Sequence, residues 1–323
     1  MTTACEIPQM NECAKSEYLK QFLNIYWLRP ETALWRTLDC LALQNLKFEA
    51  PIVDVGCGDG LFSFTRAGGE LSPNYDVFLQ TGHLEQFFKK VDIYDYFDSS
   101  VTSPLVRRTP DYEIDLGLDH KESLLKKAKL LGCYRELKIA DANRLLPVED
   151  GRFRTVFSNI LYWLEDYRVA LAEFHRILDP GGCVVLVVPS EKFKEYLLYE
   201  RLYLSTKDPK WKWLHLIDRG RSENIKLCKS YKDWKSEFES VGFTVALHKG
   251  FLSKTVLQIW DVGLRPISPL LIEMANKLKS EDRKQIKEKW IAELLPLLEP
   301  LCDLEDEKDT VPPSFHLFLL NRK

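Results

Sequence analysis

Asp54-Val55-Gly56-Cys57-Gly58-Asp59-Gly60 follows a short apolar run and precedes Leu61-Phe62-Ser63-Phe64, the start of a helical pattern. Glycines at every second position let the backbone turn sharply and approach a ligand closely. The helix that follows offers unpaired N–H groups and the positive end of its dipole. The stretch therefore predicts a strand, a tight turn and a helix, with a loop suited to the polar or anionic edge of a cofactor.

Strand and helix patterns alternate along the rest of the chain. Two helices precede the glycine loop, and Pro30 opens the second of them. Six further apolar runs have strand character, at residues 112–118, 137–140, 155–158, 183–188, 242–247 and 315–320. Apolar residues at helical spacing lie between most of them, and Gly132 ends one such helix. This alternation is typical of an α/β fold, in which a mostly parallel, doubly wound sheet has helices on both faces.

The spacing of the glycines also distinguishes between two kinds of nucleotide-binding site. The dinucleotide fingerprint is G-x-G-x-x-G, but Leu61 stands where its third glycine would be, which disfavours a nicotinamide-dependent oxidoreductase. Residues 53–60 instead resemble motif I of the class I S-adenosylmethionine-dependent methyltransferases, of the small-molecule methyltransferase type. Further motifs of that family follow in order, among them the E-x-x-R-x-L-x-P-G-G turn at residues 173–182. The resemblance covers residues 52–189, apart from one insertion.

The resemblance implies a fold, a cofactor and an activity. The fold is a Rossmann-like sheet of seven strands in the order 3-2-1-4-5-7-6, with strand 7 antiparallel and helical insertions that form a lid. The cofactor is S-adenosylmethionine, and the product after methyl transfer is S-adenosylhomocysteine. The alternative is a catalytically inactive protein that binds the cofactor or a protein partner, because a fold alone does not establish activity.

The resemblance also implies which residues contact the cofactor. Asp54 would hold the ammonium group directly or through water, Asp119 would accept the ribose hydroxyls, and Asp141 would face the adenine. The segment after residue 158 would line the methionine arm. The full set of matched positions is Asp54, Gly56, Cys57, Gly58, Gly60, Asp119, His120, Asp141, Ala142, Asn159 and Leu161.

An insertion at residues 67–110 departs from the family's pattern. It places Asp119 59 residues after Gly60, whereas the acidic residue normally follows the glycine loop by about 20 residues. A connection from the first helix to the second strand leaves the sheet at the edge opposite the ligand crevice. We therefore expect a structural or oligomer-contact subdomain, and a fold back over the cofactor is the alternative.

A second insertion, at residues 190–231, leaves the carboxyl end of the fifth strand beside the crevice. Its aromatic residues are suited to a lid that positions the acceptor and excludes water. His215 is the one histidine in this segment and is the candidate general base for a hydroxyl acceptor. Local packing of His215 within the lid is the alternative, and Tyr162 is the reserve catalytic candidate.

Charge and composition limit the partners. The formal net charge is −3 and the pI is about 6.1, so the chain lacks the overall positive charge that attracts the phosphate backbones of nucleic acids. We expect a small-molecule, sugar or lipid-linked glycan acceptor and no nucleic acid. Lys210-Trp211-Lys212-Trp213 leaves peripheral membrane contact open, and a homodimer is also left open. The eight cysteines lack metal-ligand spacing and are interpreted as reduced thiols, so we expect no metal and a cytoplasmic location. The longest apolar stretches, such as residues 184–188, are far shorter than the about 20 residues of a membrane span, so we expect no transmembrane segment.

The chain divides into four predicted parts. Residues 1–50 form N-terminal helices that could belong to the lid, and residues 51–189 form the cofactor-binding core with its insertion at 67–110. Residues 190–231 form the lid and acceptor-binding insertion. Residues 232–323 complete the core and contain a helical insertion at 252–312.

Overall fold

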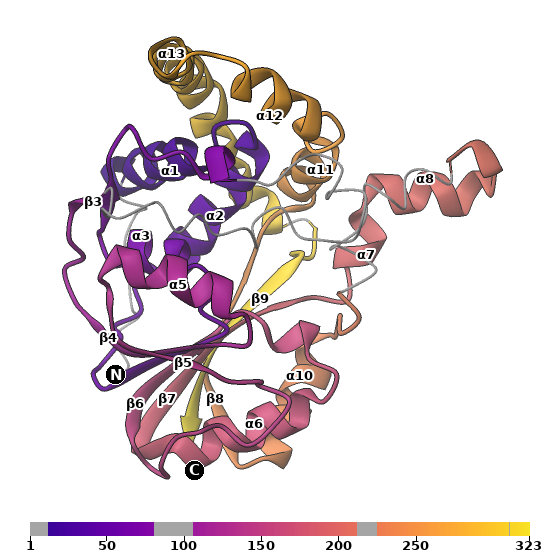
Figure 1. Cartoon of the computed structure of the whole chain (residues 1–323). Coiled ribbons are helices and arrows are strands. Elements are labelled where there is room, and N and C mark those ends of the chain that lie inside the picture. Colours follow the sequence, from indigo (N-terminus) through magenta and orange to yellow (C-terminus); the bar gives the residue numbers. More distant parts are fainter. Residues whose placement is uncertain (1–11, 81–105, 212–224, 310) are drawn as a thin grey trace.

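The protein is described by a computed structural model, which covers residues 12–80, 106–211, 225–309 and 311–323. A twisted seven-stranded sheet forms its centre, with helices on both faces (Figure 1). The strands are β1 (Ile52–Val55), β4 (Ile114–Asp119), β5 (Tyr134–Ile139), β6 (Phe153–Ser158), β7 (Leu178–Pro189), β8 (Phe243–Phe251) and β9 (Phe315–Arg322).

The order of the strands confirms the predicted topology. The sheet runs β5-β4-β1-β6-β7-β9-β8, which is 3-2-1-4-5-7-6 when the seven strands are counted along the chain. β1, β4, β5, β6 and β7 pair in parallel, whereas β9 is antiparallel to both of its neighbours, β7 and β8. The carboxyl ends of the parallel strands therefore share one edge of the sheet, and β9 begins at that edge.

The helices begin and end largely as the sequence predicts. Pro30 is the first residue of α2, and Gly132 ends α5 in the left-handed conformation. The helices are α1 (Glu12–Tyr26), α2 (Pro30–Leu43), α3 (Leu61–Arg66), α5 (Glu122–Leu131), α6 (Tyr167–Ile177), α7 (Phe193–Tyr196), α8 (Leu198–Thr206), α10 (Tyr231–Ser240), α11 (Lys254–Val262), α12 (Ser268–Asn276) and α13 (Ser280–Leu298).

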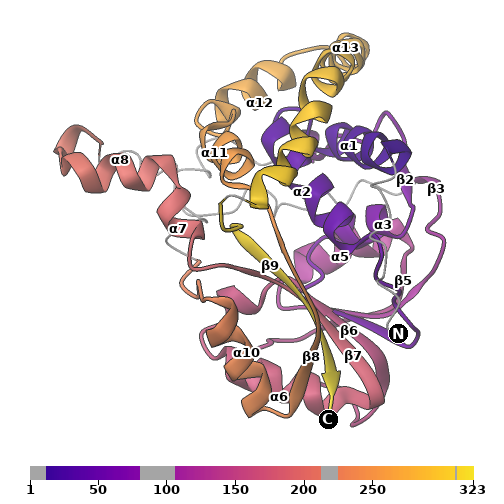
Figure 2. The same cartoon turned by 180° about the vertical axis from the view of Figure 1, so that it is seen from behind.

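Apolar cores lie on both faces of the sheet. α6 and α10 cover one face, and α2, α7 and α11 cover the other (Figure 2). A third core joins α1 to α3, to α13 and to Val77 and Phe78 at the base of the first insertion. α1, the glycine-loop helix α3 and α13 are therefore joined by one apolar core.

The base of the first insertion is fastened to α13. Its two short strands, β2 (Glu70–Leu71) and β3 (Val106–Arg108), pair antiparallel. Nε of Arg283 lies 2.9 Å from Oδ2 of Asp76, and both side chains are only 5% exposed. Nζ of Lys287 donates to the carbonyls of Pro73 and Tyr75. A buried charged cluster thus fixes the segment between β2 and residue 80.

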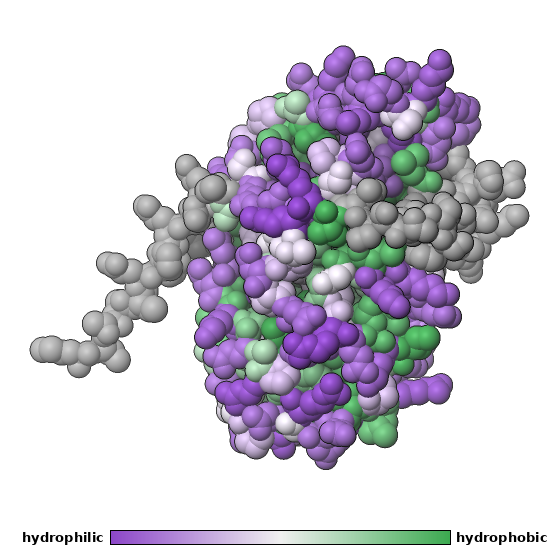
Figure 3. Space-filling model, turned by 60° about the vertical axis from the view of Figure 1, so that its left-hand side comes forward, coloured by the Kyte–Doolittle hydropathy of each residue, from purple (hydrophilic) through white to green (hydrophobic). Residues whose placement is uncertain are grey.

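Figure 3 shows one face of the molecule, on which hydrophilic residues predominate and hydrophobic residues form smaller areas between them. Within the ranges that the structure describes, no helix has the length and apolar character needed to cross a membrane.

Candidate cofactor and acceptor site

The glycine loop, residues 56–60, lies at the carboxyl end of β1. The N–H groups of Gly56 and Cys57 both donate to the carbonyl of Leu118 in β4, at 2.8 and 3.0 Å. The N–H of Gly60 donates to the carbonyl of Cys57 at 3.0 Å, and Gly60 is the N-cap of α3. The loop is therefore fixed to the neighbouring strand and leads directly into a helix, as the sequence predicts.

The three glycines share positive φ angles of 84°, 58° and 76° but have different neighbours. A Cβ at Gly56 would lie 2.5 Å from the side chain of Ile160, and one at Gly60 would lie 2.9 Å from Tyr134. Both of these glycines are needed for close packing. A Cβ at Gly58 would meet no atom of the described residues within 4 Å, so among these residues the space beside Gly58 is open to a ligand.

Asp119, the last residue of β4, has its carboxylate beside the glycine loop. Oδ2 accepts from the N–H of Gly58 at 3.0 Å, and Oδ1 accepts from the N–H of Lys121 at 2.9 Å. Nδ1 of His120 lies 3.6 Å from Oδ1, and the His120 side chain is 66% exposed. Each carboxylate oxygen has a second lone pair, so Asp119 can still accept hydroxyl groups of a ligand. The insertion has not displaced Asp119 from the loop.

Asp54 is buried within β1 and already has protein partners. Its Oδ2 accepts from the Ser63 hydroxyl at 2.6 Å and from the Tyr134 phenol at 2.8 Å. Burial raises the pKa of Asp54 to about 6, and these two hydrogen bonds act in the opposite direction. The contacts tie β1 to α3 and β5. The predicted contact of Asp54 with the cofactor ammonium stays a prediction.

Asp141 and Ala142 follow β5 at the same edge of the sheet. Oδ1 of Asp141 accepts from the backbone N–H and the side-chain amide of Asn143, at 3.0 and 2.9 Å. These bonds hold the pKa of Asp141 below its usual value. The Asp141 side chain is 44% exposed, whereas Ala142 packs into the core. Asp141 is therefore a charged, accessible acceptor at the predicted adenine position.

The segment after β6, which the resemblance assigns to the methionine arm, approaches the glycine loop through Ile160. Ser158 ends β6, and its hydroxyl donates to the carbonyl of Val55 at 2.9 Å. Leu161 is fully buried in the core, and Asn159 is half-buried. Ile160 is the residue that packs against Gly56. The predicted contact of Leu161 with the methionine arm stays a prediction.

Tyr162 lies near a cation of α2 that the sequence analysis did not select. Burial raises the pKa of Tyr162 above its usual value, and the charge of Arg36 opposes this rise. Nη1 of Arg36 lies 3.0 Å from Oδ2 of Asp39, and the Arg36 guanidinium lies 5.5 Å from the centre of the Phe62 ring. The Arg36 side chain is 34% exposed, whereas that of Asp39 is 4% exposed. Arg36, a partly exposed cation, thus lies near Tyr162 and contacts α3 through Phe62.

The signal for Arg36 was present in the sequence. Arg36 and Asp39 are three residues apart in α2, and nearly all residues of this helix are buried. A charged pair in such a helix needs a polar environment. The sequence does not place this helix at the crevice, because its position depends on packing against β6 and α11.

The first insertion approaches the crevice through Tyr75. Burial raises the pKa of Tyr75 well above its usual value, and the charge of Asp59 in the glycine loop contributes, as does Tyr26. The base of the insertion is therefore close to the glycine loop. Residues 81–105 lie outside the described part of the chain, so the expected subdomain stays a prediction.

The principal catalytic candidate, His215, falls within residues 212–224 and lies outside the described residues. Its role as a general base stays a prediction.

Solved structures similar to this chain have low sequence identity to it. The [4+2]-cyclase SpnF has a TM-score of 0.45 and 14% identity, with 89% of this chain and 81% of that chain covered. An S-adenosylmethionine-dependent methyltransferase from Mesorhizobium loti has a TM-score of 0.41 and 17% identity, with 84% and 90% covered.

Sequence comparison matches the central part of the chain. Residues 100–186 match the family model described as a methyltransferase domain. Over 71 residues the chain is 38% identical to a malonyl-[acyl-carrier protein] O-methyltransferase of Hamiltonella defensa subsp. Acyrthosiphon pisum (strain 5AT). That stretch is 22% of this chain and 27% of the relative, so the chain spans about a quarter of the curated relative that it matches.

Proposed function

We propose that this chain, which contains a methyltransferase domain of the class I type, transfers a methyl group from S-adenosylmethionine to a small-molecule, sugar or lipid-linked acceptor. The observation that carries this proposal is the meeting of Asp119 with the glycine loop. The Asp119 carboxylate accepts the Gly58 N–H at 3.0 Å, and a Cβ at Gly58 would find open space among the described residues. A carboxylate that can accept hydrogen bonds from hydroxyl groups therefore lies next to a backbone segment that a ligand can approach closely.

The described residues fit S-adenosylmethionine. Asp119 can accept the ribose hydroxyls through its remaining lone pairs, and Asp141 can accept the exocyclic amine of adenine. The Arg36 side chain is 34% exposed, and a guanidinium is suited to a carboxylate. We assign the carboxylate of the cofactor's amino-acid end to Arg36, because Arg36 lies near Tyr162 and thus near the segment expected to line the methionine arm.

The bound cofactor would supply a methyl group on a sulfonium, which is already an activated leaving group. The contribution of the protein is then mainly to position the acceptor and to exclude water. Because burial raises the pKa of the Tyr162 phenol still further above neutral pH, Tyr162 is suited to donating a hydrogen bond rather than to removing a proton. His215 remains the proposed general base for a hydroxyl acceptor.

Binding and turnover assays test the proposal in two steps. Titration calorimetry should detect binding of S-adenosylhomocysteine and no binding of NAD. Methyl-labelled S-adenosylmethionine incubated with a metabolite extract should then give a labelled product. Binding without transfer to any fraction would favour the inactive alternative, and absence of S-adenosylhomocysteine binding would contradict the proposal. The O-methyltransferase name of the bacterial relative makes oxygen acceptors the first class to test.

A further inference from the structure

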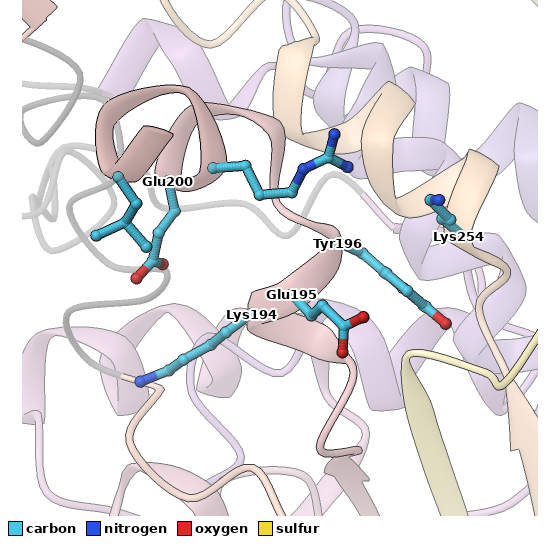
Figure 4. A pocket seen from close by; sticks show the side chains of 7 residues that line it. Lys194, Glu195, Tyr196, Glu200 and Lys254 are labelled. Atoms are coloured by element: carbon cyan, nitrogen blue, oxygen red, sulfur yellow. The ribbon is translucent and has the colours of Figure 1, made fainter. Parts of the chain in front are cut away.

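Two groups of polar side chains in the described part of the chain differ in whether they converge. The hollow between α7, α8 and α11 is lined by cations from each of these helices, but the amines of Lys194 and Lys254 lie on opposite sides of it (Figure 4). These cations therefore do not meet at one ligand. At Asp54, in contrast, the Ser63 hydroxyl and the Tyr134 phenol donate to the same oxygen, Oδ2, at 2.6 and 2.8 Å. Two hydrogen bonds, from α3 and β5, thus meet on a carboxylate two residues before the glycine loop.

Tyr134 reaches Asp54 across a strand. β4 lies between β1 and β5, the strand that contains Tyr134. Gly117 of β4 is the register partner of Asp54, and a Cβ at Gly117 would lie 2.8 Å from Cδ1 of the Tyr134 ring. Glycine weakens the interior of a strand and often marks a close approach. The ring of Tyr134 is what approaches Gly117, and it passes over this glycine towards β1.

The opposite edge of the Tyr134 ring contacts the glycine loop. A Cβ at Gly60 would lie 2.9 Å from Cε2 of the ring, whereas Gly117 faces Cδ1 and Cε1. Gly60 has a φ of 76° and is the N-cap of α3, the helix that contains Ser63. One aromatic ring therefore packs against the last glycine of the loop, covers Gly117 and presents its hydroxyl to Asp54.

The two hydrogen bonds affect how readily Asp54 ionises. Asp54 is 3% exposed, and burial raises its pKa to about 6 although the bonds from Ser63 and Tyr134 oppose the rise. The charge of Asp119 in β4 also raises this pKa, and the charge of Arg66 in α3 lowers it. Loss of either hydrogen bond would therefore move the pKa of Asp54 further upward, towards neutral pH.

The charge of Asp54 also acts on four neutral groups. Burial, followed by the charge of Asp54, raises the pKa of Tyr134 well above its usual value, so the phenol remains a donor. Burial likewise raises the pKa values of Cys57, Cys133 and Tyr112. These four groups therefore stay neutral while Asp54 titrates.

We propose that Tyr134 is a positioning residue for cofactor binding: with Ser63 it holds Oδ2 of Asp54, which leaves Oδ1 to accept from the ammonium group at the amino-acid end of S-adenosylmethionine. The proposal rests on the proposed methyltransferase function. Tyr134 acts through Asp54 and through its packing against Gly60, and not through a contact of its own with the cofactor.

Titration calorimetry with S-adenosylhomocysteine between about pH 5.5 and 8 tests this proposal. In the wild type the affinity should fall below about pH 6, where Asp54 gains a proton. Tyr134→Phe keeps the ring and removes one hydroxyl, so this fall should move upward by about 0.5–1 pH unit. The variant should then bind up to about threefold more weakly than the wild type at pH 6.5 and nearly equally at pH 8, because an ammonium group prefers the ionised carboxylate. Ser63→Ala removes the other donor and should shift the pH dependence in the same direction.

Tyr112→Phe is the matched control. The Tyr112 phenol accepts from Nη1 of Arg66 and is half-buried, so this change also removes one hydroxyl but leaves the hydrogen bonds of Asp54 in place. It should leave the affinity and its pH dependence unchanged. His120, beside Asp119, is the same in every variant, so its titration does not contribute to the differences between the curves.

Tyr134→Phe that binds as the wild type does at every pH, or more weakly by the same factor at every pH, would overturn the positioning role. If Tyr134→Phe does not fold, the same two outcomes in Ser63→Ala would overturn the proposed arrangement of Asp54. The methyltransferase function survives these outcomes, because the wild type binds S-adenosylhomocysteine in each of them. A wild type that binds no S-adenosylhomocysteine overturns the methyltransferase function and the positioning role together.

Discussion

Gly58 and Gly132 have nearly the same backbone conformation in different places. Their φ angles are 58° and 64°, and a Cβ at either position would have no described atom within 4 Å. Gly58→Ala and Gly132→Ala should therefore each lower the free energy of unfolding by about 1 kcal/mol, the penalty for a left-handed non-glycine residue. Only Gly58 adjoins the proposed cofactor, so only Gly58→Ala should also weaken S-adenosylhomocysteine binding, at least about tenfold by calorimetry. Equal loss or equal retention of affinity in both variants would remove Gly58 from the site.

Asp119 can be tested against Asp115 of the same strand. Asp119→Ala should weaken S-adenosylhomocysteine binding by about 1–3 kcal/mol, the scale for losing hydrogen bonds to a charged group. The Asp115 carboxylate accepts the Ile52 N–H at 2.8 Å and pairs with Arg135 at 2.7 Å. Asp115→Ala should therefore lower stability and leave the affinity of the folded protein unchanged. Calorimetry that finds Asp119→Ala at wild-type affinity would move the ribose contact elsewhere.

The residues of the candidate site differ in how far the sequence could identify them. Asp119 was predictable because it ends a recognisable strand, and the carboxyl ends of parallel strands share one edge. Arg36 and Tyr75 were not, because each reaches the crevice through packing between segments far apart in the chain. Leu161 was selected by position in a motif, but the direction of its side chain depends on the turn after β6.

At the scale of elements, α13 fixes the base of the first insertion through a buried ion pair. Arg283→Met leaves Asp76 charged and unpaired in a site where both side chains are 5% exposed. We expect a loss of about 3–5 kcal/mol in the free energy of unfolding, measured by urea denaturation. Lys277→Met breaks the exposed pair with Glu273 and should change stability by less than about 1 kcal/mol. Similar losses in both variants would show that burial of the Arg283–Asp76 pair does not determine its effect on the free energy of unfolding.

Element boundaries show where periodicity fails as a guide. The sequence predicts a strand at residues 183–188, but β7 runs from Leu178 to Pro189. Leu178 pairs with Phe153 and Cys183 with Thr155, so the segment containing Pro180-Gly181-Gly182 bulges within the strand. Gly and Pro in the sequence predict a turn, but the pairing of both flanking segments with β6 makes this stretch a bulge within one strand.

At the scale of the whole molecule, the strand order could be predicted although no local pattern contains it. Periodicity identifies strands and helices, whereas the order 3-2-1-4-5-7-6 came from the resemblance to a family and is confirmed by the pairings. The resemblance to the family does not predict the structure of the two insertions. Their contacts with α1, α11 and α13 had to be read from the structure.

The sheet also contains a histidine pair, in which His316 is buried and His248 is exposed. Nε2 of His248 lies 3.1 Å from Nδ1 of His316, and Nε2 of His316 lies 3.9 Å from the Glu191 carboxylate. Burial lowers the pKa of His316 to about 4, and the neighbouring His248 lowers it further, while a backbone hydrogen bond with Lys229 opposes the change. Burial also lowers the pKa of His248. The pair is therefore neutral in the folded protein at neutral pH.

This pair should make the fold sensitive to mild acid. Between about pH 6.5 and 4 the unfolded chain binds protons that folded His316 does not, so the free energy of unfolding falls as the pH falls, by at most about 1.4 kcal/mol per pH unit for this histidine. Burial acts to raise the pKa of Glu237, but hydrogen bonds from Arg168 and Lys229 lower it to about 2, so the stabilisation by Glu237 is lost only below about pH 4.5. Asp54, whose pKa burial raises to about 6, acts in the opposite direction below about pH 6, because there the folded protein binds a proton that the unfolded chain does not. Urea denaturation of wild type and variant between pH 7 and 5 therefore reports His316 as the difference between the two curves. His316→Gln should remove the loss of stability that His316 causes as the pH falls, whereas His120→Gln, at a side chain that is 66% exposed, should leave the pH dependence unchanged. Identical pH dependences in the wild type and His316→Gln would contradict the neutral state of His316.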